Sequence, residues 1–504
     1  MSQQQPGRRT ALKAAGAGAL AVAAGAVAAD PASAQDSAAP SPAPRGDRGL
    51  AAQLRRALPD DQVLVRGDAA YDAERAAFHR VVDHHPAAIV VPRRAKDIAA
   101  AVRVASCHRV PIAVQATGHG ISRSAHGGLL INTRRMKTIR IDAARRTAVV
   151  GPGVVFAELI EAAAAHGLAP AGGSASDVSV AGYTSGGGLP VIGRTVGFAA
   201  DHVTRVDLVD AKGRRRRLTP HHDTDLFWAV RGGKSNFGVI TEIETALFPL
   251  TRLYGGTMLF VGGVPELLRA YQKFTRDLTE RMTTSLVIVN VPADSPAFPE
   301  PLRGKTLAKL RVAFTGDAAE GEKLLRPLRA LGPAQDGVAD MPYTDIAKIY
   351  ADPAGPIRTR ERAGTLRALD DPTLRRLLQA AGPDAERPPM AVEIRHLGGA
   401  LARPPKHPNA VGPRDAAFTL FVADMAPNPA QDAALEAGQQ RVFDILGPSL
   451  TGHALPNFLT DHDSTATRVR RAYRPRDYDR LATLKRRYDR HNLFRVNHNI
   501  PPAA

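Results

Sequence analysis

The feature that most constrains this chain is a pair of glycine-marked turns within residues 111–201. The first turn is Gln115-Ala116-Thr117-Gly118-His119-Gly120. The second occupies residues 172–182 and leads into three consecutive glycines at residues 186–188. Because glycine has no Cβ, backbone N–H groups in such turns can approach an anionic or flat ligand closely. The pattern therefore predicts a ligand cradle, and His119 stands inside it, where its imidazole would face the ligand.

The size and charge of the chain exclude several classes of protein. Its 504 residues, 44% hydrophobic and 23% charged, indicate a large globular protein with an ordinary core. The net charge of +18 invites a nucleic-acid interpretation, but the only dense basic run, residues 212–217, follows a strand-like segment and contains a turn glycine. We therefore expect an exposed hairpin tip and no nucleic-acid partner. The single cysteine, Cys107, excludes an internal disulfide framework and a multi-cysteine metal site, and no metal is predicted.

Residues 1–34 have the parts of a twin-arginine export signal in the right order. Arg8-Arg9-Thr10-Ala11-Leu12-Lys13 precedes an apolar run at residues 14–29, and Ala32-Ser33-Ala34 supplies a cleavage site. The run is too short and too weakly hydrophobic to span a bilayer, which takes about 20 residues, so we expect no stable membrane insertion. The protein would use the twin-arginine export machinery and be secreted or periplasmic; an unprocessed tail is the alternative. Residues 35–48, rich in Ala, Pro, Ser and Asp, indicate a flexible linker.

From Gly49 onward, hydrophobic periodicity predicts mixed helices and strands. Strand-like residues 89–91 and 111–114 flank a helical segment at 97–108, which predicts a βαβ unit. The other predicted strands are at 129–131, 147–150, 203–209, 238–240, 285–289, 310–314, 391–397 and 418–423, and the other helices are at 156–166, 318–331 and from Pro475 onward. This order predicts an α+β fold rather than a doubly wound sheet, and the dinucleotide fingerprint GxGxxG between a strand and a helix is absent.

Six short motifs in fixed order resemble a known family. They are Gly118-His119, Gly151-Pro152-Gly153, Val178-Ser179-Val180-Ala181-Gly182, Gly186-Gly187-Gly188, Asp225-Leu226-Phe227-Trp228-Ala229-Val230-Arg231-Gly232-Gly233 and Asn236-Phe237-Gly238-Val239. In this order they resemble the FAD domain of the vanillyl-alcohol-oxidase superfamily (PCMH-type FAD binding), in its berberine-bridge-enzyme-like branch. The resemblance covers roughly residues 60–250 and resumes at residues 492–501. It implies an FAD-binding domain at 49–250, a substrate domain at 251–455 whose antiparallel sheet covers the flavin, and a segment at 456–504 that returns to the FAD domain.

The resemblance implies a single covalent link to FAD. The first turn would wrap the pyrophosphate, although it departs from the usual Arg-Gly/Ser-Gly-Gly-His, and His119 stands where the family's histidine bonds the flavin 8α-methyl. A histidine that only hydrogen-bonds within the turn is the alternative. Ala175 occupies the position at which many members carry a second, cysteine anchor. The implied cofactor-binding residues are Gln115, Ala116, Thr117, Gly118, His119, Gly120, Ser176, Asp177, Gly182, Ser185, Gly186, Val239, Asn497 and Asn499; for the two asparagines, capping of the preceding helix is the alternative.

The resemblance also implies the reaction: a hydride passes from a C–H next to a hydroxyl or amine of a small molecule to the flavin, and the electrons pass to dioxygen. Val178 occupies a position linked in the family to dioxygen access, and a valine favours an oxidase, although a plain core valine explains it equally well. Sugar-oxidising relatives carry a tyrosine two residues before an Asn-Phe pair. Here Asn457-Phe458 has Leu455 at that position, and leucine cannot take a proton.

The predicted catalytic bases are His396 and Glu393, in the strand at residues 391–397. Side chains alternate along a strand, so Glu393 and Arg395 share one face, His396 lies on the other, and either face could overlook the flavin. A packed histidine and a salt-bridged glutamate are the alternatives. The sequence thus predicts an exported FAD-dependent oxidoreductase that acts on a hydrophobic or multi-ring substrate. A sugar oxidase with a base other than tyrosine, or a flavin-binding protein without turnover, remains open.

Overall fold

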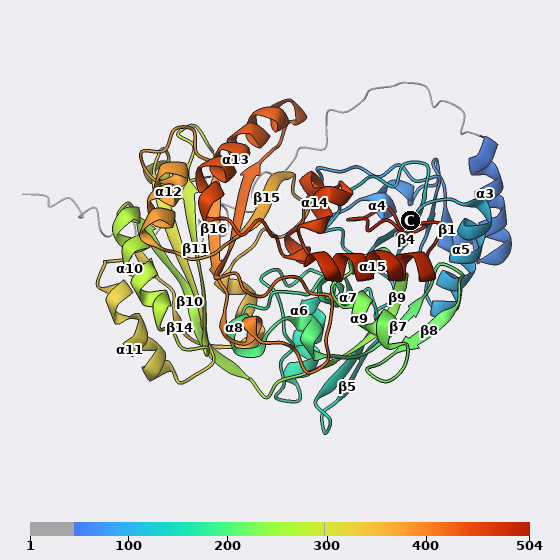
Figure 1. The fold of residues 1–504 in the computed structure, drawn as a ribbon, viewed down its shortest axis with the longest axis horizontal. Coiled ribbons are helices and arrows are strands. Elements are labelled where there is room, and N and C mark those ends of the chain that lie inside the picture. The colour runs from blue at the N-terminus through green and yellow to red at the C-terminus, as the bar shows by residue number, and fades with distance from the viewer. Residues whose placement is uncertain (1–44, 297) are drawn as a thin grey trace, which may run out of the picture.

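The structure, a computed structural model, describes residues 45–296 and 298–504 (Figure 1). The predicted export signal and most of the predicted linker lie outside the described residues. Helix α3 (Arg45–Ala57) begins ahead of Gly49, where the structured chain was expected to start. Leu50 and Leu54, one turn apart, are buried against α5 (Ala95–His108), which explains why the helix forms.

A four-stranded sheet contains the predicted βαβ unit. Its strands are β1 (Val63–Leu64), β2 (Ala88–Val90), β4 (Leu129–Asn132) and β3 (Ile112–Gln115), in that spatial order. Both β2 and β3 pair in parallel with β4, and α5 supplies the connection from β2 to β3. Ile98, Val102 and Ala105 of α5 are buried against the sheet, and β3, which follows this helix, leads directly into the first glycine turn.

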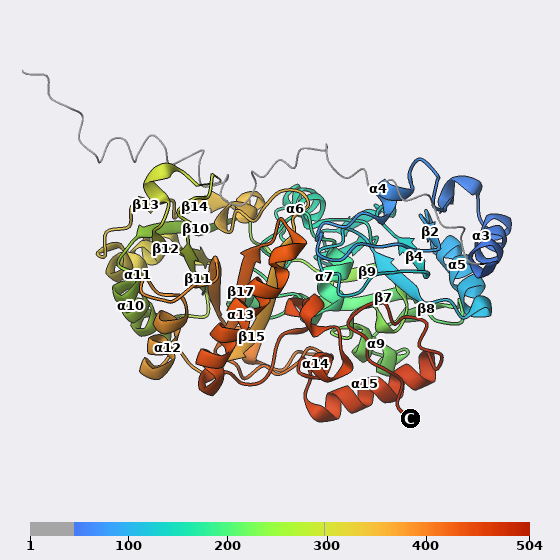
Figure 2. The ribbon, with the colours of Figure 1, turned by 90° about the horizontal axis from the view of Figure 1, so that it is seen from above.

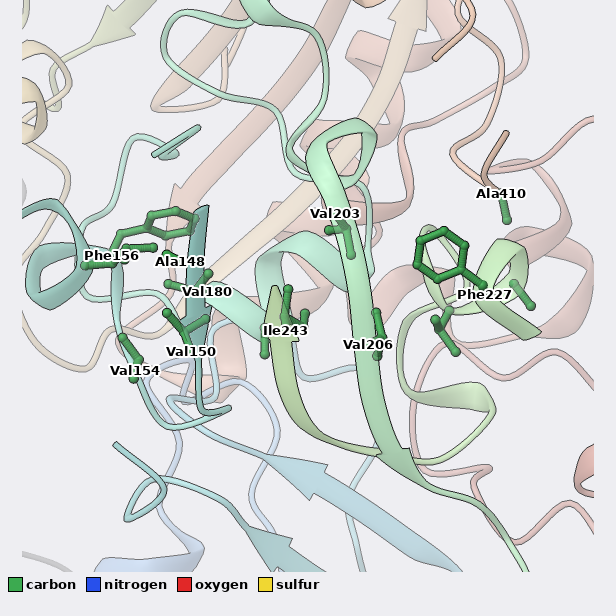
Figure 3. Close-up of a cluster of buried hydrophobic side chains, with 14 of the residues drawn as sticks. Ala148, Val150, Val154, Phe156, Val180, Val203, Val206, Phe227, Ile243 and Ala410 are labelled. Carbon is green, nitrogen blue, oxygen red and sulfur yellow. The ribbon is translucent and has the colours of Figure 1, made fainter. Parts of the chain in front are cut away.

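A five-stranded antiparallel sheet forms the centre of the same half of the molecule. Its order is β5 (Ile139–Asp142), β6 (Thr147–Val150), β9 (Val239–Ala246), β7 (Val203–Val209) and β8 (Arg215–Leu218). Helices α6 (Phe156–Ala164), α7 (Val180–Ser185) and α9 (Thr224–Val230) pack on it. Figure 3 shows this core running from Phe156 and Val150 at one side, past Ile243, to Val206 and Phe227 at the other.

The basic run is part of the hairpin between β7 and β8. Gly213 occupies the turn with a φ of 69°, so the run is a hairpin as predicted. Arg216 pairs with Asp210 and Asp223, and Arg217 pairs with Asp207. Part of the positive charge is therefore balanced within the hairpin and its neighbours.

An eight-stranded antiparallel sheet makes up the other half of the molecule (Figure 1). Its strands are β13 (Gln335–Asp336), β10 (Arg252–Val261), β12 (Thr306–Phe314), β11 (Met282–Asn290), β16 (Ala391–His396), β17 (Phe418–Met425) and β15 (Thr359–Leu366), with β14 (Ala339–Pro342) paired to β10. Helices α10 (Val264–Arg276), α11 (Ala318–Arg329), α12 (Asp371–Ala381) and α13 (Asp432–Leu446) cover one face, where Leu286, Ile394 and Leu420 are buried beneath them. The opposite face carries alternating polar side chains, among them Arg311, Glu393 and Arg395.

The C-terminal segment returns to the first half of the molecule. Helix α15 (Pro475–Tyr488) lies along the part that contains β7 and β9 (Figure 2), and its apolar stripe of Tyr478, Leu481, Leu484 and Tyr488 is buried in the core of the five-stranded sheet. Short elements complete the fold: α4 (Tyr71–Arg75), α8 (Gly193–Val196), α14 (Ala466–Arg470), η1 (Asp60–Gln62), η2 (Ala199–His202), η3 (Lys234–Asn236), η4 (Glu300–Leu302), η5 (Tyr343–Ile349), η6 (Gly399–Ala402), η7 (Pro429–Gln431), η8 (Gly447–Ser449), η9 (Pro456–Phe458) and η10 (Asp461–Asp463). The α+β fold class is confirmed. No helix within the described residues is long and apolar enough to cross a bilayer.

Candidate functional site

A cavity of about 340 Å³ lies where the two glycine turns meet the C-terminal segment and the eight-stranded sheet. Residues 113–123 of the first turn line it, together with α7, η3, Arg395 of β16, Asn457 and Phe458 of η9, and residues 496–498. Among the described residues, the charged side chains of its wall are Arg123, Lys234 and Arg395, and no carboxylate lines it. The wall therefore favours a ligand that carries negative charge.

The backbone N–H groups of the first turn have no acceptor within the described residues. The carbonyl oxygens of Thr117 and Gly118 accept hydrogen bonds from the amides of Phe78 and His79, at 3.0 and 3.1 Å. Among the described residues, none accepts a hydrogen bond from the amides of residues 116–120. Consecutive unpaired amides form a concavity that binds anions such as a pyrophosphate.

Gly118 sets the shape of this turn. Its φ is 81°, in the left-handed region that side chains rarely adopt. A Cβ at this position would lie 2.6 Å from the Cβ of Ala77, because the turn packs closely against the segment that contains Ala77 and Phe78. The glycine thus permits the close approach of two backbone segments that fixes the next residue, His119.

His119 is held between an aromatic ring and a carboxylate. Its imidazole stacks on Phe78, with ring centroids 3.7 Å apart, and its Nε2 lies 3.2 Å from Oδ1 of Asp177 in the second turn. The approach of Asp177 is off the direction of a hydrogen bond, so Nε2 has no hydrogen-bond partner within the described chain. The ring is fixed in orientation while its nitrogens remain available.

Several other buried polar atoms around the cavity have no partner in the part of the chain that the structure describes. They are Oε1 of Gln115, Oγ of Ser122, the hydroxyl of Tyr183 and the Oδ1 atoms of Asn497 and Asn499. A buried polar atom without a partner costs about 1–3 kcal/mol, and natural proteins leave few. Their concentration at one cavity fits a large ligand with many hydrogen-bonding groups, as FAD is.

The second turn is fixed by a helix cap. Ser179 precedes α7; its Oγ accepts from the amide of Gly182 at 3.2 Å and donates to the carbonyl of Pro152 at 2.8 Å. Tyr183 follows on α7 and packs edge-on against Phe156. Burial raises the pKa of Tyr183 well above its ordinary value, so its hydroxyl is a neutral donor or acceptor, and the residue lines the cavity.

The predicted cofactor residues fall into two groups. Those that line the cavity are Gln115, Ala116, Thr117, Gly118, His119, Gly120, Gly182, Ser185 and Asn497. Ser176, Asp177, Gly186, Val239 and Asn499 are not among the lining residues; Val239 packs in the core of the four-stranded sheet, and its neighbours Gly238 and Ile240 face the cavity instead. Val178 also lines the cavity.

The eight-stranded sheet contributes a charged wall centred on Glu393. Oε1 of Glu393 accepts from Arg311 at 2.6 Å, and Oε2 accepts from Nη2 and Nε of Arg395 at 3.0 and 3.1 Å. Burial opposes ionisation of this carboxyl, but the two guanidinium groups prevail and hold the pKa of Glu393 below its ordinary value. Both arginines also contact the ring of Tyr350, each at 4.6 Å from its centroid. Of the two faces of β16, the Glu393–Arg395 face is therefore the one at the cavity.

His396 lies on the other face of β16, outside the cavity wall. It stacks on Phe418, and its Nε2 lies 3.2 Å from Nη1 of Arg194, which anchors α8 to the start of β11. Burial, reinforced by the charge of Arg194, lowers the pKa of His396 to about 3. This geometry corresponds to the alternative of a packed histidine, because the imidazole of His396 does not line the cavity.

Leu455 is buried in an apolar cluster with Leu189, Phe198 and Val411. Of this cluster, Leu189 and Phe458 reach the cavity. Asn457 also lines it and donates from Nδ2 to the carbonyl of Tyr183 at 2.8 Å. Leu455, which stands at the position of the family's tyrosine, therefore contributes only apolar packing.

Sequence reasoning missed several polar residues of the wall, among them Ser122, Lys234 and His498. Lys234 is the most informative, because its Nζ donates to Nδ1 of His498 at 3.0 Å. The available signal was the pair Lys234-Ser235 directly after Gly232-Gly233, a charged residue inside a glycine-marked turn. His498 and Ser122 stood next to predicted residues but carried no separate pattern.

Comparisons with known proteins agree with this site. Residues 86–219 match the FAD binding domain family, and residues 456–501 match the family described as berberine and berberine like. (R)-6-hydroxynicotine oxidase of Paenarthrobacter nicotinovorans is 28% identical over 457 residues, which are 88% of this chain and 97% of the relative. An uncharacterized FAD-linked oxidoreductase of Bacillus subtilis, YvdP, is 26% identical over 460 residues, 88% and 98% of the two chains.

Solved structures share the fold. The crystal structure of 6-hydroxy-D-nicotine oxidase from Arthrobacter nicotinovorans superposes with a TM-score of 0.77 at 24% identity and covers 88% of this chain and 98% of its own. A chitooligosaccharide oxidase superposes with a TM-score of 0.75 at 20% identity, over 90% of this chain and all of its own. The cavity and its free polar atoms thus belong to a fold that FAD-linked oxidases also have.

Proposed function

The chain belongs to the berberine-bridge-enzyme-like FAD-linked oxidoreductases, and on that premise we propose that it is an oxidase of small molecules. In this proposal a hydride passes from a C–H next to a hydroxyl or amine to FAD, and dioxygen accepts the electrons. The observation that carries it is the cavity itself: unpaired amides and free polar atoms on one side, and the Arg395 wall on the other. Val178 in the cavity wall supports the choice of dioxygen.

The bound FAD supplies the two-electron chemistry, and the chain supplies binding, orientation and proton handling. The amides of residues 116–120 would hold the pyrophosphate. His119 would form the single covalent bond to the 8α-methyl, since Phe78 and Asp177 hold its ring in one orientation. Asn497 and Tyr183 would hydrogen-bond the flavin ring, which has both donors and acceptors along its edge.

The charged wall bears on the choice of substrate. Glu393 is the better placed of the two predicted bases, because it adjoins Arg395 at the cavity, whereas His396 faces away. A carboxylate held by two arginines is nevertheless a weak base. A neutral amine can release a hydride without prior deprotonation by the protein, so the geometry favours amine donors over alcohols. The hydroxynicotine oxidase named above, an oxidase of a nitrogen-containing ring compound, supports the same class.

The purified protein tests the proposal directly. We expect a yellow preparation whose flavin stays with the protein after acid precipitation. An amine of the right class should bleach the flavin absorbance under nitrogen, and admission of air should restore it with release of hydrogen peroxide. Bleaching by sugars alone would favour the sugar-oxidase alternative, and a yellow protein that no donor bleaches would favour a silent flavin binder.

We also propose that the protein is exported through the twin-arginine route, on the evidence of residues 1–34. Replacement of Arg8 and Arg9 by lysine keeps the charge but removes the paired guanidinium groups. The variant should accumulate in the cytoplasm while the parent protein appears outside it, as fractionation and immunoblotting would show. Equal export of both proteins would contradict this route.

A further inference from the structure

We infer that Lys234 is a cation in contact with the flavin ring and that its positive charge favours the reduced state of the cofactor. The inference rests on the proposed function, because it assumes that FAD fills the cavity. It adds a residue to which none of the motifs of the chain assigned a role.

Lys234 occupies an unusual backbone position. It begins η3, directly after Gly232 and Gly233, and its φ of 55° lies in the left-handed region that favours glycine. A lysine at this position carries a conformational cost that glycine would avoid. The side chain is also half-buried in the cavity wall, which adds a cost of desolvation for its ammonium.

The hydrogen bonds of the ammonium leave one donor for a ligand. An ammonium has three N–H groups. One donates to the carbonyl of Pro456 at 3.2 Å and one to Nδ1 of His498 at 3.0 Å. Nε2 of His498 lies 2.8 Å from the carbonyl of Thr460 and donates to it, so Nδ1 of His498 is an acceptor. The third N–H of Lys234 has no partner among the described residues, and the side chain lines the cavity.

The fully buried Lys485 shows what a purely structural ammonium looks like. Lys485 donates all three N–H groups to protein oxygens, those of Asn236, Asp489 and Phe494, at 2.7 to 2.9 Å. Lys309 is half-buried in β12, outside the cavity wall. Lys234 alone of the three combines partial burial, an unused donor and a place in the cavity wall.

The neighbours of Lys234 place it at the flavin ring rather than at the pyrophosphate. Its side chain adjoins Gly186 together with the amide of Asn457, and the next residue, Ser235, accepts a hydrogen bond from Asn497 at 3.2 Å. Phe458, the neighbour of Asn457, lies against Arg395 of the covering sheet, whose guanidinium is 5.3 Å from the centre of its ring. The unpaired amides of residues 116–120, which would hold the pyrophosphate, belong to a different loop.

A cation at this place changes the redox balance by simple electrostatics. Hydride transfer moves two electrons and one proton from the substrate C–H to bound FAD and adds one negative charge to its ring system; the substrate's hydroxyl or amine proton leaves to solvent. Reoxidation by dioxygen takes up one further proton and yields hydrogen peroxide. A buried positive charge within contact distance stabilises the more negative state, because little water screens it.

Sulfite binding and the midpoint potential measure this effect without turnover. Sulfite adds to oxidised flavin and, like reduction, places negative charge on the ring. Flavin-loaded Lys234→Met should bind sulfite at least tenfold more weakly and have a potential lower by about 30 mV, the two-electron equivalent of tenfold. Lys234→Arg should retain most of both properties, and Lys309→Met, which removes a half-buried charge outside the cavity, should retain them fully.

The controls separate a charge effect from a packing effect. Lys234→Gly suits the left-handed backbone and should show the same loss as Lys234→Met. Unchanged sulfite affinity and potential in both variants would overturn the inference, and so would an equal loss in Lys309→Met. If Lys234→Met and Lys234→Gly lose their flavin and Lys234→Arg keeps it, the contact with the cofactor is supported; loss in all three would overturn the charge role. A parent protein without flavin would instead refute the proposed function itself.

Discussion

Single residues define the cavity through hydrogen-bonding capacity that the protein leaves unused. Gln115 shows this clearly: its Nε2 donates to the carbonyl of Ala76 at 3.0 Å, while its Oε1 is buried without a partner in the described chain. Tyr183 and Asn497 repeat the pattern from α7 and from the C-terminal segment. Because each unpaired atom costs about 1–3 kcal/mol in the empty protein, a ligand that satisfies them gains affinity and stabilises the fold.

His119 should be the only covalent anchor of the flavin. In His119→Ala the flavin should appear in the supernatant after acid precipitation, whereas in the parent protein it should stay with the pellet. The reason is that Ala175 offers no sulfur for a second bond. His126→Ala removes an exposed histidine from the same loop and should keep the flavin attached. Flavin that remains attached in His119→Ala would place the bond elsewhere.

Much of this residue-level picture was predictable, because glycine turns and the adjoining histidine are local in sequence. The first turn and His119 lie together in the cavity wall as expected. The choice between Glu393 and His396 was not predictable, since alternation along a strand fixes which residues share a face but not which face meets the other half of the molecule. Lys234 was missed because its role depends on His498, which is distant in sequence.

At the scale of elements, the first turn depends on Gly118 far more than on Gly120. Gly118→Ala should lower the free energy of unfolding by about 2–4 kcal/mol, from a strained left-handed φ and a clash with Ala77. In Gly120→Ala the new Cβ would have no atom within 4 Å, and φ is not positive, so the change should stay within about 0.5 kcal/mol. Urea unfolding of the two variants, side by side, measures the difference. Equal losses would contradict this account of the turn.

The C-terminal helix depends on one buried ion pair. Lys485 and Asp489 are both fully buried, with Nζ of the lysine 2.8 Å from Oδ2 of the aspartate. Asp489 also accepts hydrogen bonds from the amides of Leu493 and Phe494. Lys485→Met leaves the carboxylate buried without its cation, so the free energy of unfolding should fall by about 3–5 kcal/mol. Arg476→Met, on the same helix but 80% exposed, should change it by less than about 0.5 kcal/mol. Similar stabilities for the two variants in urea would show that the pair does not hold the segment.

Elements with regular patterns were predicted from the sequence, and those with mixed patterns were not. Strand β7 matches its predicted bounds, because Val203, Val206 and Leu208 mark its buried side. Strand β15 was missed because its polar residues point to both faces: Glu361 lies toward the first half of the molecule, near His79, and Arg362 lies over the ring of Phe443 of α13. Strand β10 was also missed, because two interior glycines interrupt its pattern of side chains. The eight-stranded sheet could therefore not be assembled from periodicity alone.

At the scale of the whole molecule, buried histidines make the fold sensitive to acid. Burial lowers the pKa of His84 to about 4, and burial with the charge of Arg194 lowers that of His396 to about 3. Burial also lowers the pKa of His202 and His498. Carboxyl groups with lowered pKa, such as Glu393 and Glu361, lose their stabilising charge only at still lower pH. Just below the ordinary pKa of histidine, about 6.5, the loss of folding stability with falling pH therefore comes from the buried histidines.

The sign of this effect follows from proton linkage. A histidine whose pKa is lower in the folded protein binds its proton more readily when unfolded, so acid favours the unfolded chain. Between about pH 7 and about pH 5, His396 alone should reduce the free energy of unfolding by about 2 kcal/mol. His396→Phe keeps the stacking on Phe418 but removes the titrating group, so its stability should fall by about 2 kcal/mol less over the same interval. His126→Ala, which removes an exposed histidine, should follow the parent protein. Urea unfolding of the three flavin-loaded proteins at the two pH values measures these slopes, and equal slopes for His396→Phe and the parent would show that His396 is not kept neutral by its buried position.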